Sequence, residues 1–273
     1  MMKKCFLLAS VFSVSLFSVA ANSAEMCTQQ TLLEDFEGGS LNESLWSYDI
    51  GDGCDINLCG WGNNEKQSYQ RENVQLRDGN LVITAKQEGE YITSGKITTR
   101  AKFAQRFGRF EARIKVPDGL GLWPAFWLMP DDPQLSWPLE GEIDILERPG
   151  RNALDLKTLI GAAHFGELAP SNTHFAQFLI LPRHWHDDYH VYAVDWTEGL
   201  VVWTVDGREF ARFTRDDAAP FDWPFDRKSF FVKLNLAVGG TLGGDVHSES
   251  FPGEMLIDYV KVSNFVPCES DKS

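Results

Sequence analysis

Three acidic residues lie close together in the segment Gly141-Glu-Ile-Asp-Ile-Leu-Glu147 of this 273-residue chain. In a β-strand, residues two apart point to the same face, so Glu142 and Asp144 share a face and the isoleucine between them points to the other. Strict alternation would place Glu147 on the face opposite Glu142. A β-bulge after Asp144 adds one residue and restores the parity. We therefore expect a bulged strand with all three carboxylates on one face.

Clustered carboxylates repel one another, and this repulsion raises the pKa of at least one of them. A retaining glycosidase uses such a set, because one ionised carboxylate attacks the anomeric carbon and a second, protonated one delivers a proton to the leaving oxygen. An acid between them can hydrogen-bond the nucleophile and adjust the charge during turnover. The alternatives are a solvated strand face, which usually mixes charges of both signs, and a calcium site, which needs more oxygen ligands nearby. The spacing by itself favours a hydrolase over these alternatives.

Short segments that alternate apolar and polar residues recur along the chain and predict β-strands, because they have strand length and are rich in Val, Ile, Phe and Thr. They cover residues 80–86, 92–103, 107–116, 142–147, 188–195, 200–205, 231–236 and 255–262. Turn signals separate them, and Asp206-Gly207 at the centre of residues 201–209 predicts a β-hairpin. No stretch has a long helical period. The pattern indicates an all-β sandwich or barrel.

Nine tryptophans occur in the chain. Core packing accounts for Trp46, Trp196 and Trp203. Six others have polar or glycine-rich surroundings: Trp61, Trp123, Trp127, Trp137, Trp185 and Trp223. We expect Pro124 to interrupt strand pairing beside Trp123, and Trp137 to lie in a loop with Pro138. The flat apolar face of tryptophan can stack on the C–H groups of a pyranose ring, so loop tryptophans near the acids indicate sugar-binding platforms.

The N-terminus has the pattern of a signal peptide. Two lysines precede an apolar run over residues 5–21, and small residues between Ala20 and Ala24 offer a cleavage site. We predict a signal peptide over residues 1–24 and a single catalytic domain over residues 25–273, because no linker or internal repeat divides the chain. The protein is therefore expected to be secreted or periplasmic. No later segment is long and apolar enough to cross a bilayer, so we expect no membrane partner.

Acidic residues outnumber basic ones by 39 to 25, which gives a net charge of −14. Phosphate binding needs a basic surface, so we expect no nucleic-acid partner. A neutral polymer fits this balance better, although acidity also keeps an exported protein soluble. We expect the protein to act as a monomer.

Four cysteines remain once the signal peptide, which contains Cys5, is removed. An even number in an exported protein favours disulfides, and four cysteines allow three connectivities. Proximity in the chain predicts a Cys54–Cys59 bond, and the usual closeness of domain termini predicts a Cys27–Cys268 bond. Their spacing matches none of the usual zinc-ligand patterns.

Six further segments accompany the acidic strand segment. They are Trp61-Gly-Asn-Asn-Glu65, Asp78-Gly-Asn-Leu-Val-Ile-Thr-Ala85, Phe107-Gly-Arg-Phe-Glu-Ala-Arg113, Trp123-Pro-Ala-Phe-Trp127, Asn235-Leu-Ala-Val-Gly-Gly240 and Ile257-Asp-Tyr-Val-Lys-Val262. Together, and in this order, they resemble glycoside hydrolase family 16 in its bulged-strand form, and within it the laminarinases that cut β-1,3-glucans. The resemblance covers nearly the whole mature chain. It implies a β-jelly-roll sandwich of two antiparallel sheets with an open concave cleft, and endo cleavage of β-1,3-glucan with retention and without a catalytic cofactor.

By position, the resemblance implies that Glu142 is the nucleophile, Asp144 the assisting acid and Glu147 the general acid/base. The residues that match sugar contacts of the family are Trp123, Trp127, Trp137, Asn63 and His164. For His164, a packed strand histidine is an equally good interpretation.

The resemblance also implies a structural calcium ion on the face away from the cleft. Asp258 would be its side-chain ligand, with backbone oxygens near Glu37 and Gly79. Two positions depart from the family pattern. Leu146 replaces a common Met of similar volume, so we expect little effect. Lys96 replaces a common Arg and cannot form the planar bidentate fork, which leaves the linkage preference open.

Three alternatives remain. A related endo-hydrolase could cut mixed-linkage β-1,3-1,4-glucan or a galactan, although sulfated galactans would favour a basic cleft. A transglycosylase would share the intermediate but transfer it to a sugar. A non-catalytic glucan-binding module fits less well, because such relatives lose the acids that this chain retains.

Overall fold

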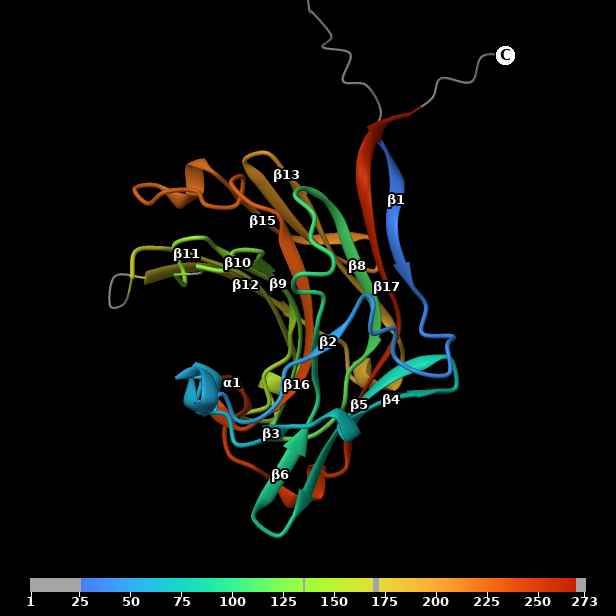
Figure 1. Cartoon of the computed structure of the whole chain (residues 1–273). Coiled ribbons are helices and arrows are strands. Elements are labelled where there is room, and N and C mark those ends of the chain that lie inside the picture. The colour runs from blue at the N-terminus through green and yellow to red at the C-terminus, as the bar shows by residue number, and fades with distance from the viewer. Residues whose placement is uncertain (1–25, 135, 169–171, 269–273) are drawn as a thin grey trace, which may run out of the picture.

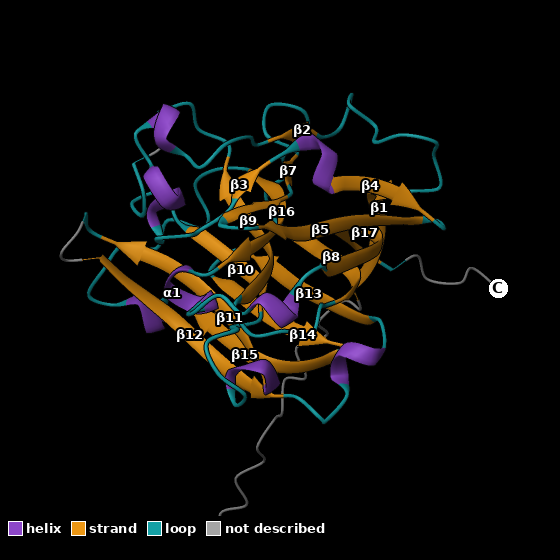
Figure 2. Ribbon diagram, turned by 90° about the horizontal axis from the view of Figure 1, so that it is seen from below, coloured by secondary structure: helices purple, strands orange, loops and turns teal. Residues whose placement is uncertain are grey.

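The computed structural model describes residues 26–268 apart from residue 135 and residues 169–171, so the predicted signal peptide lies outside the described part. The described chain folds into two large β-sheets with short helical turns in the connections (Figures 1 and 2). This confirms the jelly-roll sandwich that the sequence and its family resemblance predict.

The ten-stranded sheet has the order β15-β14-β13-β8-β17-β5-β6-β3, with β1 paired to β17 and β4 paired to β5. Its strands are β1 (Met26–Glu34), β3 (Ser68–Tyr69), β4 (Val74–Arg77), β5 (Asn80–Glu88), β6 (Tyr91–Ser94), β8 (Gly108–Lys115), β13 (His190–Thr197), β14 (Leu200–Val205), β15 (Arg208–Thr214) and β17 (Gly253–Pro267). Its pairings are antiparallel except for the short parallel pair of β3 and β6. The predicted hairpin is formed by β14 and β15.

The seven-stranded sheet has the order β12-β11-β10-β9-β16-β7-β2, and all its pairings are antiparallel. Its strands are β2 (Ser47–Tyr48), β7 (Lys96–Thr98), β9 (Leu122–Pro130), β10 (Glu142–Glu147), β11 (Thr158–Gly166), β12 (Asn172–Ile180) and β16 (Phe230–Val238). The single α-helical turn among the described residues is α1 (Gly240–Gly243), and 3-10 turns cover Cys54–Ile56, Cys59–Gly62, Arg71–Asn73, Asp155–Lys157, Trp185–Asp187, Asp216–Ala218 and Ser248–Ser250.

A connected cluster of buried apolar side chains fills the space between the sheets. Trp46, Trp196 and Trp203 are fully buried in it, as the sequence predicts. Trp223 is also buried, packed 5.0 Å from Phe213 between ring centroids, so its polar sequence neighbours do not reflect its tertiary surroundings.

The expectation of an interrupted strand at Pro124 is wrong, because Trp123 and Trp127 both lie within β9. Pro124 is opposite Leu236 of β16, whose N–H instead donates to the Gly95 carbonyl of the other neighbour. The nitrogen of Pro124, which carries no hydrogen, therefore faces the β10 side of β9. Strand β10 ends at Glu147, opposite Ala125, so the β-ladder needs no hydrogen bond from the nitrogen of Pro124.

Two disulfides join Cys54 to Cys59 and Cys27 to Cys268, which are the predicted pairs. The second holds the start of β1 against the end of β17, where the two strands leave the sandwich side by side (Figure 1). Within the described residues, the helices are too short to cross a lipid bilayer.

Candidate active site

The predicted bulge is present in β10. The register of β10 shifts between Asp144 and Glu147 on the β11 side and between Asp144 and Leu146 on the β9 side. Ile145 and Leu146 are both buried, so the bulge sends two consecutive side chains into the core. Glu147 then returns to the face that carries Glu142 and Asp144, and all three acids line one cleft.

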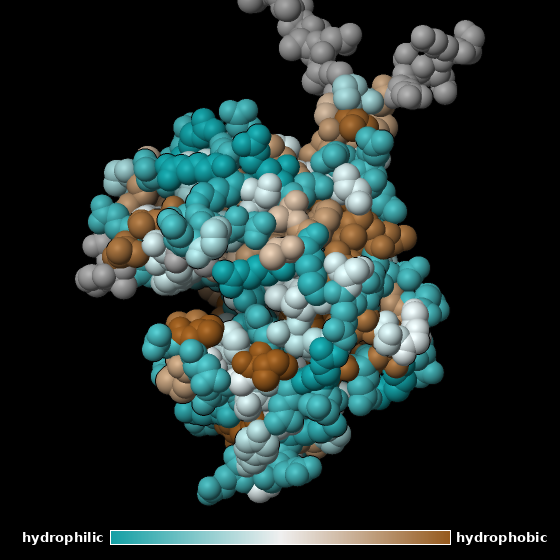
Figure 3. All heavy atoms as spheres, viewed as in Figure 1, coloured by the Kyte–Doolittle hydropathy of each residue, from teal (hydrophilic) through white to brown (hydrophobic). Residues whose placement is uncertain are grey.

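This cleft has a volume of about 480 Å³ and crosses the seven-stranded sheet. It opens as the hollow on the left of Figure 3, where β10 faces the disulfide-closed loop of Cys54 and Cys59. Strands β7, β9, β10 and β16 supply its floor, and Ile56, Leu58 and Trp61 form the facing wall.

Each acid has a fixed partner in the cleft. Trp137 Nε1 donates to Glu142 Oε2 at 2.8 Å, and Trp123 Nε1 donates to Glu147 Oε1 at 3.1 Å. His164 lies directly opposite Glu142 on β11, and its Nε2 is 3.1 Å from Asp144 Oδ2. These contacts hold the carboxylates in defined orientations before any substrate binds.

The surroundings raise the pKa of two of the three acids. Burial, and then the negative charge of Asp144, raise the pKa of Glu142 from 4.5 to about 7. The same two causes raise the pKa of Glu147 well above its usual value. Burial by itself would lower the pKa of His164, but its hydrogen bond to Asp144 and the charges of the three acids raise it to about 10. His164 is therefore cationic at neutral pH and offsets part of the negative charge.

A chain of hydrogen bonds joins polar side chains of the cleft floor. Trp127 Nε1 donates to Asn235 Oδ1 at 2.7 Å, and Asn235 Nδ2 donates to the Tyr69 hydroxyl at 3.2 Å. The Tyr69 hydroxyl donates to Glu65 Oε2 at 3.0 Å, and Asn63 Nδ2 donates to Glu65 Oε1 at 3.4 Å. The network fixes the orientation of the Trp127 ring and of the Asn63 amide.

Two lysines lie beside the Trp127 ring. Lys96 is only 4% exposed, and its Nζ lies 3.9 Å from the centroid of the Trp61 ring and 5.3 Å from that of Trp127. Lys233 Nζ lies 4.7 Å from the Trp127 centroid and 3.0 Å from Asp49 Oδ2. Burial, and then repulsion by Lys233, lower the pKa of Lys96 to about 7. The contact with Trp61 opposes this change, because an aromatic face attracts a cation.

The structure brings the sequence-selected residues together. The members that line the cleft are Glu142, Asp144, Glu147, Trp123, Trp127, Trp137 and Asn63. His164 lies beside them, in contact with Asp144. The residues selected from the sequence did not include Trp61, which also lines the cleft and begins one of the segments that carry the family resemblance. They also did not include Lys233 and Asp49, which line the cleft and for which no local pattern gives a signal.

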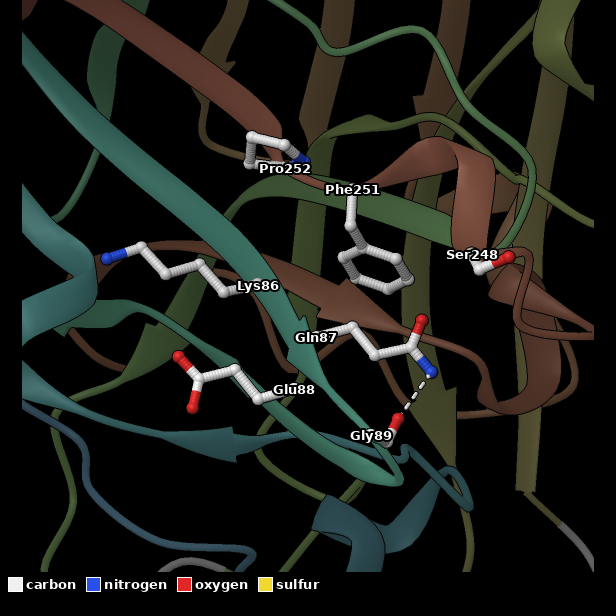
Figure 4. Close-up of a pocket in the computed structure, with 7 residues that line it drawn as sticks. All are labelled: Lys86, Gln87, Glu88, Gly89, Ser248, Phe251 and Pro252. Atoms are coloured by element: carbon white, nitrogen blue, oxygen red, sulfur yellow. Dashed lines mark hydrogen bonds between the residues drawn. The ribbon is translucent and has the colours of Figure 1, made fainter.

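The second hollow lies between the end of β5 and the loop before β17 (Figure 4). Its acidic lining residue is Glu88, and Gln87 turns back to donate to the Gly89 carbonyl at 3.0 Å. Lys86 points away from Phe251 in this view. The hollow lacks the paired carboxylates that glycoside hydrolysis needs.

The surroundings of Asp258 differ from an all-oxygen calcium site. Asp258 Oδ2 lies 2.7 Å from Arg113 Nη1, so a guanidinium already neutralises this carboxylate. Glu37 does lie beside Gly79, since a Cβ on Gly79 would be 2.8 Å from Glu37 Oε1. Within the described residues, groups of three or more metal-ligating side chains occur elsewhere.

Comparison with known proteins gives a consistent result. The chain is 33% identical to a β-glucanase of Rhodothermus marinus over 97% of this chain and 96% of that protein. It is 35% identical to glucan endo-1,3-beta-glucosidase A1 of Niallia circulans over 84% of this chain, and spans only 37% of that longer protein. The crystal structure of the endo-β-1,3-glucanase from Pyrococcus furiosus superimposes with a TM-score of 0.80 at 32% identity, covering 88% of this chain and 96% of that one. The family model described as "Glycosyl hydrolases family 16" matches residues 62–261. The bulged acidic strand, the cleft that it lines and these similarities together show that the chain belongs to glycoside hydrolase family 16.

Proposed function

We propose that the protein is an endo-β-1,3-glucanase that cleaves its substrate with retention of configuration. The observation that carries the proposal is the bulge in β10, which gathers Glu142, Asp144 and Glu147 on one face of an open cleft. An open cleft admits the interior of a polymer. The names of the related proteins support β-1,3-glucan as the substrate class.

In this proposal Glu147 carries the proton that the leaving oxygen receives, since its pKa is raised well above the usual value. Glu142 attacks the anomeric carbon and forms a glycosyl-enzyme ester, and Glu147 then acts as the base that activates water. Asp144 lies between the two acids and is held by cationic His164, 3.1 Å away. The acids interact strongly, so their proton losses belong to the set rather than to single residues.

The cleft also supports a neutral glucan as the ligand. Trp61, Trp127 and Trp137 line it and offer flat faces to pyranose rings. Asn63 and Lys233 supply hydrogen-bond donors among them, which suits sugar hydroxyls.

The substrate is tested by incubating the mature protein with laminarin, barley β-glucan, agarose and xyloglucan and following reducing ends with time. We expect cleavage of laminarin, with mixed-linkage glucan as a secondary substrate. Activity on agarose with none on laminarin would overturn the assignment. A product series that lengthens instead of shortening would identify a transglycosylase.

The stereochemistry is tested by NMR of the first product. We expect the β-anomer to appear first from a β-glucan, because two displacements restore the configuration. Prior appearance of the α-anomer would show inversion and would remove Glu142 from the role of nucleophile.

We also propose that the protein is exported as a single catalytic domain and acts as a monomer. The two disulfides suit an oxidising compartment. Mass spectrometry of protein from a secreting host measures the N-terminus, for which we expect a first residue from Ala21 to Glu25, after cleavage between Ala20 and Ala24. Light scattering should give the mass of one chain. A retained N-terminus or a dimer mass would each overturn the corresponding part.

The calcium ion implied by the family resemblance would share Asp258 with Arg113, which already pairs with Oδ2 of this carboxylate. The test is the Tm of the mature protein with and without an excess of a calcium chelator. A fall in Tm that added calcium reverses would support the ion, and an unchanged Tm would count against it.

A further inference from the structure

A second group of metal-ligating side chains lies in the connection between β12 and β13. His184, His186 and Asp187 each offer a ligand atom, and these atoms all lie within 4.8 Å of one another. None of the three lines the cleft. Asp118, from the connection between β8 and β9, approaches His186.

The distances within this group are too long for good hydrogen bonds but match the edges of a coordination tetrahedron. His184 Nδ1 lies 3.4 Å from Asp187 Oδ2, and His186 Nε2 lies 3.4 Å from Asp187 Oδ1. His186 Nε2 also lies 3.5 Å from Asp118 Oδ2. Two ligand atoms that are each about 2.0–2.1 Å from a tetrahedral zinc ion are separated by about 3.3–3.4 Å. The two 3.4 Å contacts use different oxygens of Asp187, so side-chain rotation has to gather one atom of each residue around an ion, starting from atoms within 4.8 Å of one another.

The local fold explains why the ligands converge. His184 has φ 68°, in the left-handed region, and the 3-10 turn Trp185–Asp187 follows it. In a 3-10 turn, residues three apart lie on the same side, which brings Asp187 beneath His184. Trp185 anchors the turn, because its Nε1 donates to the buried Tyr192 hydroxyl at 2.7 Å. The histidines on either side of Trp185 are then left on the outer surface.

A buried arginine positions the carboxylate from the second connection. Arg148 is 1% exposed, and its Nη2 donates to Asp118 Oδ1 at 3.1 Å. The other oxygen of Asp118 is the one that faces His186. Such an outer partner orients a ligating carboxylate, as is common at metal sites.

We propose that His184, His186 and Asp187 form a binding site for a divalent transition-metal ion, with Asp118 as the nearest fourth ligand. Imidazole nitrogens combined with carboxylate oxygens suit Zn²⁺ and the neighbouring first-row ions. The ion links the connection after β12 to the connection after β8, and through Arg148 to the end of β10. It stabilises the folded chain and takes no part in the reaction at the acids.

The test is Zn²⁺ titration of the mature full-length protein at pH 7.5 by calorimetry, with Tm measured in parallel. The variants are His184→Ala and His186→Ala. His247→Ala is the matched control. His247 Nδ1 lies 3.4 Å from Glu249 Oε1, a contact like those of His184 and His186. Among the described residues, however, His247 belongs to neither group of metal-ligating side chains. Glu142→Gln serves as a second control, because Glu142, Asp144 and His164 also lie close enough to hold an ion.

We expect one Zn²⁺ to bind and to raise the Tm, and each of the two histidine variants to weaken the affinity at least tenfold. The two control variants should keep the affinity of the wild type at this site. Binding should also weaken from pH 7.5 to pH 5.5, because the ligating histidines must be neutral. Wild-type affinity in His186→Ala, or loss of binding in Glu142→Gln instead, would overturn the proposal. The absence of binding at millimolar Zn²⁺ would do the same.

Discussion

The raised pKa of Glu142 makes a quantitative prediction about stability. The cleft buries this carboxyl beside Asp144 and raises its pKa from 4.5 to about 7. At about 1.36 kcal/mol per pH unit, this change corresponds to about 3 kcal/mol. A carboxyl whose pKa is raised on folding stabilises the protein below its unfolded pKa, and this contribution is lost as pH rises through the folded pKa. Glu142 should therefore destabilise the protein progressively between about pH 4.5 and pH 7.

Glu142→Gln keeps the shape of the side chain and an oxygen that can accept from Trp137 Nε1, but it cannot ionise. Asp144 and Glu147 still repel each other in this variant, so only part of the energy is relieved. We expect the free energy of unfolding of the variant at pH 8 to be about 1–3 kcal/mol higher than that of the wild type, which corresponds to a Tm higher by roughly 3–9 °C. Near pH 4 the two proteins should be equally stable, because both then carry a neutral group at this position.

The measurement is urea unfolding followed by circular dichroism from pH 4 to pH 9. Glu90→Gln is the control, because Glu90 is exposed in the turn between β5 and β6 and its removal changes the net charge equally. The control should follow the wild type at every pH. If the free energy of unfolding changed with pH in the same way for the wild type and Glu142→Gln, the reasoning would be refuted. Ionisation of Glu142 in the cleft would then not destabilise the folded protein.

Three further predictions concern the cleft. In Glu142→Ala, azide should partly restore turnover and give a glycosyl azide of inverted configuration. In Glu147→Ala, azide should give the glycosyl azide of retained configuration. NMR of the products distinguishes the two, and the reverse pattern would exchange the roles of Glu142 and Glu147. Trp137→Ala should lower kcat/KM on laminarin by about 5–30-fold, equivalent to about 1–2 kcal/mol of lost stacking. The reason is that Trp137 is 41% exposed in the cleft and donates a hydrogen bond to Glu142. A large fall in Tm with unchanged kinetics would show a structural role instead. Lys96→Met should raise the Tm at pH 6 and have a smaller effect near pH 10. The lysine, with a folded pKa of about 7, destabilises the protein while it is protonated, and an equal change at both pH values would contradict this.

The sequence by itself determined the local arrangement of the acids. Alternation places Glu142 and Asp144 on one face, and the five-residue separation of Glu142 from Glu147 requires a bulge, which β10 contains. It also determined the hairpin at Asp206-Gly207 and both disulfide pairs. These features depend on strand periodicity, turn chemistry and the position of chain ends, and all three can be read from short stretches or from the termini.

Only the tertiary structure decided which strands are neighbours. Strand β9 pairs with β16, more than a hundred residues away in the chain, and this pairing brings Asn235 and Lys233 to Trp127. Periodicity specifies the face of a residue but not the strand beside it, because any apolar strand face can pack in the same core. For this reason no sequence pattern indicates that Lys233 lies in the cleft.

The same limit explains the groups whose chemistry depends on distant residues. The pKa of Lys96 falls because the packed sheets bury its ammonium group and because β16 places Lys233 near it. Asp118 meets His186 because two connections far apart in the chain end at one place. Burial and charge act over a few ångströms in space. They are therefore fixed by the packing of the two sheets, and not by the order of residues along any one strand.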